Sequence, residues 1–190
     1  MAGAIDPGGL DGDLARLIAD SRADEAIRAR QRERNLRAAA ATDATLAGLV
    51  LDLAELGDPV TLRTTSGRSL TGRIATVARD AVVLEVDSGA TSFVRLAAVS
   101  SIRRAGGHRL PQVSGDRSPS RAPTLAALLA DLAPERPRVA LAVHGEPGLV
   151  RGELRAAGAD VVTVTLDGDL PVTAYFATAQ VSELTVLASG

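Results

Sequence analysis

The spacing of hydrophobic and polar residues predicts helices first and strands afterwards. Residues 10–41 are mostly polar, with a weak apolar repeat of three and four residues that is typical of an exposed helix. A stronger apolar stripe runs from Leu46 to Leu56. It predicts a helix with one buried face, which Thr42 or Asp43 caps and Gly57 ends.

The spacing changes to two residues after Pro59. Five short runs of alternating or β-branched residues follow, separated by turn residues, and the last ends near Ile102. Gly72 lies inside the second run, where a glycine permits a strong bend. Five closely spaced strands predict a small barrel, because a flat sheet of that size would leave two edges and one face uncovered.

The whole pattern then repeats, which is the strongest regularity in the chain. Residues 124–133 echo residues 45–54. After one extra residue in the following turn, Gly152 matches Gly72 and Asp160 matches Asp80. In the last strands the matching residues are Tyr175 with Phe93, Val181 with Val99, and Leu184 with Ile102. A matched helix, glycine, aspartate and pair of final strands in one order indicate an internal duplication.

The stretch between the repeats is rich in Gly, Pro, Ser and Arg, which is typical of a linker. We therefore expect four segments along the chain. They are a helical segment at residues 1–41, a first barrel at 42–104, a flexible basic linker at 105–122 and a second barrel at 123–190.

A leading helix and five strands, with Gly72-x-Ile74 in the second and the apolar run Val82–Leu84 in the third, resemble the Sm-like family, which includes the bacterial Hfq branch. The resemblance covers residues 45–104 and 124–187. It implies two five-stranded small β-barrels of Sm-like or SH3-like type, each preceded by an α-helix. With the long N-terminal helix, this gives a mainly β fold class.

The same resemblance implies a function. Sm-like proteins assemble into rings in which the fourth strand of one unit pairs with the fifth strand of the next, and loop residues hold RNA around the pore. Two barrels per chain would close a six-unit ring from three chains. The implied partners are RNA and further copies of the chain.

Composition adds limits on the partners. The net charge is −2 and aromatic residues make up 2% of the chain, so base stacking has few side chains to use. The chain has no cysteine, which removes disulfides and thiolate chemistry. No signal peptide and no long apolar run are visible, so we expect a cytoplasmic protein with no membrane partner.

The candidate chemistry is sparse. His108 and His144 have no nearby carboxylate cluster, and no nucleophile motif or phosphate-binding loop occurs, so we expect no metal, no cofactor and no enzyme activity. Phosphate contact remains a candidate role for a small set of residues in the N-terminal helix and in two loops: Arg28, Arg30, Arg34, Arg79, Asp80 and Arg95. A solvated helical face and ordinary turn charges are the simpler explanation of the same residues.

Two functions therefore remain open. The first is a non-catalytic RNA-associated protein, with the arginine-rich segments supplying most of the affinity. The alternative is a protein-interaction or self-assembly scaffold without nucleic acid, which the acidic pI of about 5.7 and the scarce aromatic residues favour.

Overall fold

The computed structural model describes residues 21–22, 24–25, 27–36, 38–39, 42–104 and 115–187. The chain divides into two compact units, Met1–Asp43 and Ala44–Gly190. In the first unit, residues 27–36 form a continuous helical stretch whose side chains are all exposed. The remainder of the predicted N-terminal helix falls partly on residues outside the described set.

The described residues of the second unit form two α-helices, α2 (Leu46–Leu56) and α3 (Leu125–Leu132). Each begins after a threonine whose hydroxyl accepts a hydrogen bond from a first-turn amide: Thr45 from Gly48 N and Thr124 from Ala127 N. The cap of α2 is therefore Thr45, and the predicted caps Thr42 and Asp43 were wrong. Gly57 ends α2 with a φ of 66°, a conformation that favours glycine.

Among the described residues of the second unit there are also ten strands and three short 3₁₀ helices. The first repeat contains β1 (Val60–Thr64), β2 (Ser69–Val77), β3 (Ala81–Val86), β4 (Thr91–Arg95), η1 (Leu96–Ala98) and β5 (Val99–Arg104). The second repeat contains η2 (Ala133–Glu135), β6 (Arg138–Val143), β7 (Leu149–Ala157), β8 (Val161–Leu166), β9 (Val172–Ala177), η3 (Thr178–Gln180) and β10 (Val181–Val186).

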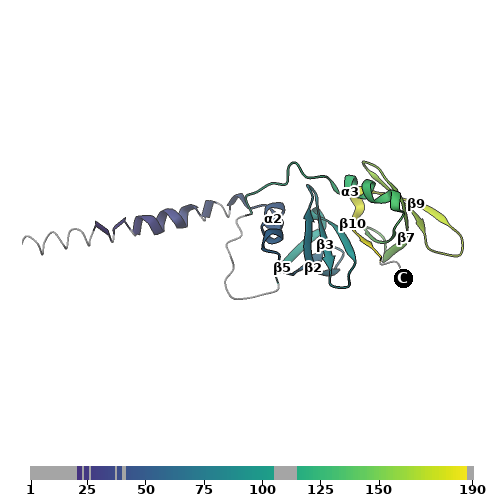
Figure 1. Cartoon of the computed structure of the whole chain (residues 1–190), viewed down its shortest axis with the longest axis horizontal. Coiled ribbons are helices and arrows are strands. Elements are labelled where there is room, and N and C mark those ends of the chain that lie inside the picture. Colours follow the sequence, from purple (N-terminus) through teal and green to yellow (C-terminus); the bar gives the residue numbers. More distant parts are fainter. Residues whose placement is uncertain are drawn as a thin grey trace, which may run out of the picture. The chain divides into compact units, whose positions relative to one another are not determined.

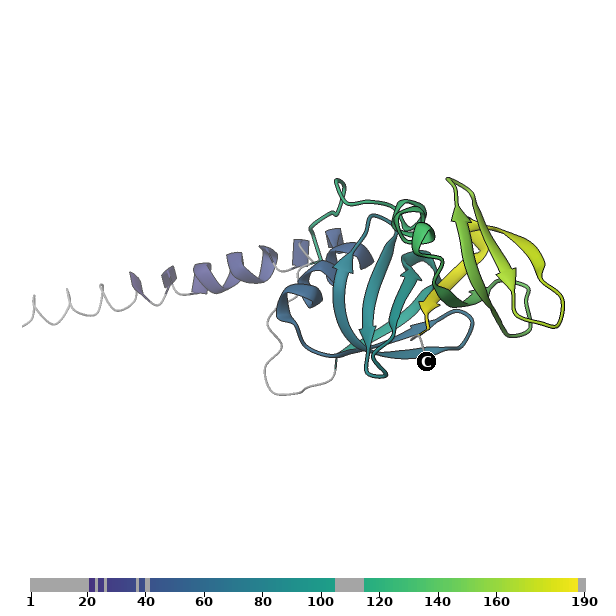
Figure 2. The same ribbon diagram turned by 45° about the vertical axis from the view of Figure 1, so that its right-hand side comes forward.

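The strands form one open antiparallel sheet in the order β5-β1-β2-β3-β4-β10-β6-β7-β8-β9. The prediction of two closed five-stranded barrels with a long N-terminal helix is therefore wrong. The first repeat does not close on itself, because β4 bonds to β10 of the second repeat. In Figures 1 and 2 the yellow β10 lies between the teal strands of the first repeat and the green strands of the second.

The internal repeat is confirmed strand by strand. Within each repeat the first, second, third and fourth strands pair in succession, and the first strand also pairs with the fifth. Both second strands carry an irregularity at the same place, between Ile74 and Thr76 in β2 and between Leu154 and Ala156 in β7. The chain therefore contains two copies of one five-stranded arrangement.

Gly72 and Gly152 occupy matching positions that demand glycine. A Cβ on Gly72 would lie 2.1 Å from the carbonyl oxygen of Glu85, and one on Gly152 would lie 2.2 Å from that of Thr165. Neither glycine has a positive φ, so the requirement comes from the close approach of the neighbouring strand.

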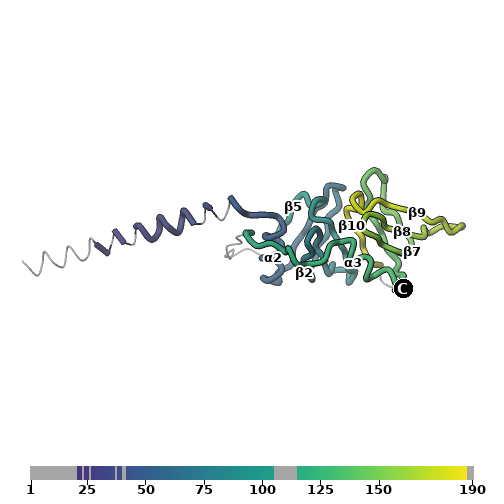
Figure 3. Tube along the Cα trace, turned by 90° about the horizontal axis from the view of Figure 1, so that it is seen from above, coloured from purple at the N-terminus to yellow at the C-terminus, as the bar shows by residue number. Residues whose placement is uncertain are grey.

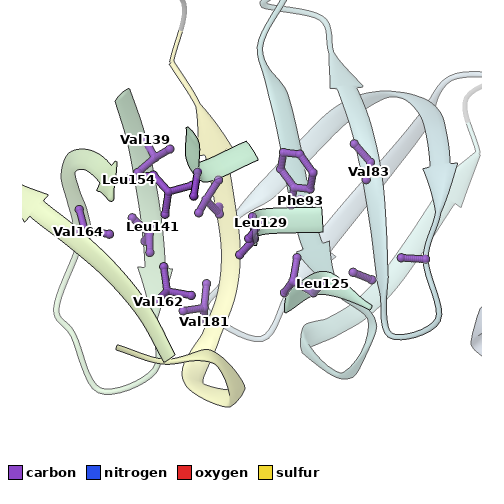
Figure 4. Close-up of a cluster of buried hydrophobic side chains, with 14 residues drawn as sticks. Val83, Phe93, Leu125, Leu129, Val139, Leu141, Leu154, Val162, Val164 and Val181 are labelled. Atoms are coloured by element: carbon purple, nitrogen blue, oxygen red, sulfur yellow. The ribbon is translucent and has the colours of Figure 1, made fainter. Parts of the chain in front are cut away.

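Two hydrophobic clusters fill the unit. One lies within the first repeat, where Val50 and Leu53 of α2 pack on strands β1 to β4. The other contains buried residues of the second repeat together with Ala78, Ala81, Val83 and Phe93 of the first. Figure 4 shows Leu125 and Leu129 of α3 between Phe93 on one side and Leu141 and Leu154 on the other. The two repeats therefore share one core across β4 and β10.

Candidate functional site

The contact between the two repeats is the best-defined interface in the described part of the chain. We call it the internal joint: the pairing of β4 with β10, and the packing of α3 on β3 and β4. In this joint Leu184 lies opposite Phe93 and Glu183 lies opposite Val94. The hydroxyls of Ser92 and Thr185 share a hydrogen bond of 2.8 Å across it.

Apolar burial supplies the centre of the internal joint. Val83 of β3 and Phe93 of β4 are both buried, with Phe93 only 9% exposed. They belong to the cluster that includes Leu125 and Leu129 of α3. Removing apolar area from water stabilises such a contact by about 25 cal/mol per Å².

Arg95 ties β4 to the second repeat through backbone oxygens. Its guanidinium donates to the carbonyl oxygen of Thr178 at 2.5 Å and to that of Val181 at 3.2 Å. It also forms an ion pair with Asp80, whose oxygen lies 3.3 Å from Nη1. Arg95 therefore links the loop before β3 to the turn that begins β10.

Asp80 also accepts a hydrogen bond from the start of α3. Its Oδ1 accepts a hydrogen bond of 2.7 Å from the backbone N–H of Leu125. The preceding residue contributes as well, because the Arg79 N–H donates to the Pro123 carbonyl at 2.9 Å. Together, Arg79 and Asp80 hold both sides of the helix start, and a carboxylate at a helix N-terminus is electrostatically favourable.

A buried ion pair forms the other polar contact of the internal joint. Nε and Nη2 of Arg68 donate to the two carboxylate oxygens of Glu183, at 2.9 and 3.1 Å. The Glu183 side chain is fully buried, and Thr185 donates a further hydrogen bond of 3.1 Å to it. Sequence reasoning missed this pair, although Glu183 is a charged residue in an apolar strand where the first repeat has Ser101.

The second repeat has a corresponding surface that no described residue covers. Tyr175 of β9 corresponds to Phe93 and is 72% exposed, and Val161 of β8 corresponds to the fully buried Ala81 and is also exposed. We call Val161, Thr163 and Tyr175 the β9 face. β9 is an edge strand of the sheet, and β5 is the edge at the opposite end (Figures 1 and 3).

The first repeat has a counterpart of the surface that β10 and α3 contribute to the internal joint, and no described strand pairs with the outer edge of its last strand, β5. Leu46 begins α2 at the position that Leu125 takes in α3. Leu125 is fully buried in the internal joint, whereas Leu46 is 37% exposed. We call β5 and the N-terminal turn of α2, including Leu46, the β5 face.

The predicted phosphate-contact residues fall into two groups. Arg79, Asp80 and Arg95 come together in the internal joint, as described above. Arg28, Arg30 and Arg34 belong to the first compact unit, where their side chains are exposed. RNA contact by either group stays a prediction.

Residues 115–117, which belong to the predicted linker, are bonded to α2. Arg117 donates to Asp52 at 2.6 Å and to Glu55 at 2.5 Å, and the Gly115 N–H donates to Asp52 at 2.9 Å. The hydrogen bond from Arg117 lowers the pKa of the Glu55 carboxyl below its usual value, and the bonds to Glu55 and Asp52 raise the pKa of Arg117. Gly48 fits beneath this segment, since a Cβ there would lie 2.1 Å from the Gly115 oxygen.

The described residues hold no group of three or more His, Asp or Glu side chains that could bind a metal ion. None of the helices in the described part of the chain is long and apolar enough to cross a membrane. Compared with known proteins, the sequence matches no protein-family model and no curated protein. The fold defines the class: an antiparallel β protein built from two repeats, with the edge strands β5 and β9 at the two ends of its sheet.

Proposed function

We propose that the chain is a self-associating scaffold in which β9 of one copy pairs with β5 of the next. One observation carries the proposal. Phe93 is buried at the internal joint, whereas Tyr175, at the same position in the second repeat, is 72% exposed. An exposed edge strand flanked by apolar side chains favours the addition of another strand.

The internal joint supplies the expected pairing register. Inside the chain, Leu184 lies opposite Phe93. Because Ile102 corresponds to Leu184 and Tyr175 to Phe93, Ile102 of one copy would lie opposite Tyr175 of the next. The neighbouring copy's α2 would then lie on the β9 face as α3 lies on Val83 and Phe93.

The two faces differ from each other, so the contact is head to tail. Contacts of this kind generate closed rings or open filaments, depending on the rotation at each joint. The β9–β5 joint would be weaker than the internal joint, because Ala177 replaces Arg95 and Ser101 replaces Glu183. Reversible, concentration-dependent association is therefore expected.

Mass measurement by sedimentation equilibrium tests the proposal. The wild-type chain is expected to show masses at multiples of 19.4 kDa that increase with concentration. Tyr175→Arg places a charge in the centre of the β9 face and is expected to shift the population towards the monomer. Leu36→Arg is the matched control, because Leu36 is equally exposed but belongs to the first unit.

Two outcomes would count against self-association through the β9 face. A wild-type mass equal to the monomer at every concentration would overturn it. Equal effects of Tyr175→Arg and Leu36→Arg would show that association uses another surface. Circular dichroism of each variant checks that the sheet is folded.

A second candidate function is nucleic-acid binding by the N-terminal segment. The exposed Arg28, Arg30 and Arg34 favour it, since several arginines on one helical stretch can neutralise phosphates. Fluorescence anisotropy with labelled A-rich and U-rich RNA, at low and physiological salt, tests it. Changing these three arginines to Gln should abolish any binding, and binding seen only at low salt would indicate non-specific attraction.

A further inference from the structure

We propose that Ala159 and Asp160 clamp the start of helix α2 of a second copy of the chain. This inference rests on the proposed self-association and names the residues that would select α2 as the docked element. At the internal joint, two hydrogen bonds hold the start of α3. In the second repeat, the corresponding groups make no such bonds to a described helix.

The observed clamp holds α3 from both sides of its N-cap, Thr124. The carbonyl oxygen of Pro123, just before the cap, accepts from the backbone N–H of Arg79 at 2.9 Å. The N–H of Leu125, just after the cap, donates to Asp80 Oδ1 at 2.7 Å. The clamp therefore consists of a backbone amide and the carboxylate of the following residue.

The second repeat contains the same two clamp groups, a backbone amide and the carboxylate of the next residue, in the same backbone setting. Ala159 and Asp160 lie between β7 and β8, as Arg79 and Asp80 lie between β2 and β3. The carbonyl of Asp80 accepts from Leu96 N at 2.9 Å, and that of Asp160 accepts from Thr178 N at 2.7 Å. The turn is therefore held in the same way in both repeats.

The side chain of Asp160 is nevertheless unused within the described part of the chain. It is exposed, and no described residue donates a hydrogen bond to its carboxylate. At the internal joint Arg95 pairs with Asp80, but the corresponding residue of β9 is Ala177. The Asp160 carboxylate is therefore open to accept from the first amide of a docked helix, as Asp80 accepts from Leu125 N.

Helix α2 offers the complementary groups. Its cap, Thr45, accepts from Gly48 N at 3.0 Å, as Thr124 accepts from Ala127 N at 3.3 Å. The Ala44 carbonyl and the Leu46 N–H therefore flank the cap as Pro123 and Leu125 do in α3. The partly exposed Leu46 would enter the β9 face beside Tyr175, as Leu125 lies in the cluster with Phe93.

The occupant must be another copy, because α2 already packs on its own repeat through Val50 and Leu53. In a second copy the same helix would carry β5 alongside it. One docking step would then form the strand pairing of β9 with β5 and the clamp on α2. The two contacts would fix the register together.

Sedimentation equilibrium on full-length variants tests the clamp. Asp160→Ala removes the carboxylate and is expected to raise the dissociation constant of the assembly about tenfold, which corresponds to roughly 1.4 kcal/mol. Asp160→Asn keeps an acceptor and is expected to restore part of the affinity. Asp169→Ala is the matched control, because it removes another exposed carboxylate of the same repeat and is expected to change nothing.

Amide hydrogen exchange gives a readout specific to the clamp. The Leu46 N–H is expected to become protected when wild-type copies associate, and to lose that protection in Asp160→Ala. If the wild type associates and Tyr175→Arg weakens association, but Asp160→Ala behaves like Asp169→Ala, the clamp is overturned and the scaffold function stands. If the wild type stays monomeric, both proposals fail.

Discussion

Phe93 and Tyr175 occupy the same position in the two repeats, yet Phe93 is 9% exposed and Tyr175 is 72% exposed. The difference arises because α3 and β10 cover Phe93, whereas no described element covers Tyr175. The internal joint is therefore complete, and under the proposed self-association the β9 face and the β5 face are the two halves of a second joint. Both proposals above follow from comparing these two places.

Removing Arg68 should destabilise the unit more than its partly exposed position suggests. Arg68→Ala would leave the fully buried Glu183 carboxylate without its cation, and such losses cost about 3 to 5 kcal/mol. Urea denaturation measures the change in the free energy of unfolding. Arg155→Ala breaks a surface pair with Glu153 and is the control, with an expected change below about 1 kcal/mol. Equal effects of the two variants would contradict the structural role of the buried pair.

Arg95→Ala should loosen the internal joint without unfolding either repeat. The variant loses the hydrogen bonds to the carbonyl oxygens of Thr178 and Val181, and bonds from a charged donor contribute about 1.5 to 3 kcal/mol each when buried. Hydrogen exchange should increase in β10 and at the start of α3, and remain unchanged in β1. If the variant changed hydrogen exchange equally in β10 and in β1, Arg95 would not act at the internal joint.

Alanine at Gly72 or Gly152 should destabilise the sheet, because the new Cβ would lie 2.1 or 2.2 Å from a neighbouring carbonyl oxygen. Forcing the strands apart typically costs about 1 to 3 kcal/mol. Thermal denaturation of each variant checks the effect. Gly148→Ala is the control, since its added Cβ would meet no atom within 4 Å and its φ is not positive.

Acid should release the segment that Arg117 fastens to α2. The pKa of Glu55 is lowered in the folded chain, so its contribution is present above the unfolded value of about 4.3 and is lost as the pH falls through the folded pKa. Exchange at the Gly115 N–H, measured relative to a strand amide, should therefore rise at low pH. Glu55→Gln should reduce this pH dependence, and an unchanged profile would assign it to other carboxylates.

The sequence by itself determined the local elements. Thr45–Gly57 and Thr124–Ala133 were recognisable as helices from their apolar stripes, and the change to a period of two marked ten strands. The duplication was also readable, because Gly72 with Gly152 and Asp80 with Asp160 recur in a fixed order. Helices and strands depend on neighbours within a few residues, and a duplication depends only on the order of residues. Both can therefore be read from the sequence.

Only the tertiary structure decided how the strands combine. Every strand edge presents the same backbone groups, so the pattern of β4 cannot say whether it closes a barrel or bonds to β10. The choice depends on burying Phe93 beneath α3 and on pairing Arg68 with Glu183, which lie 115 residues apart. The same long-range packing turned Arg79, Asp80 and Arg95 from predicted loop charges into parts of a joint. It left Tyr175 exposed on the edge strand β9 and Asp160 exposed between β7 and β8.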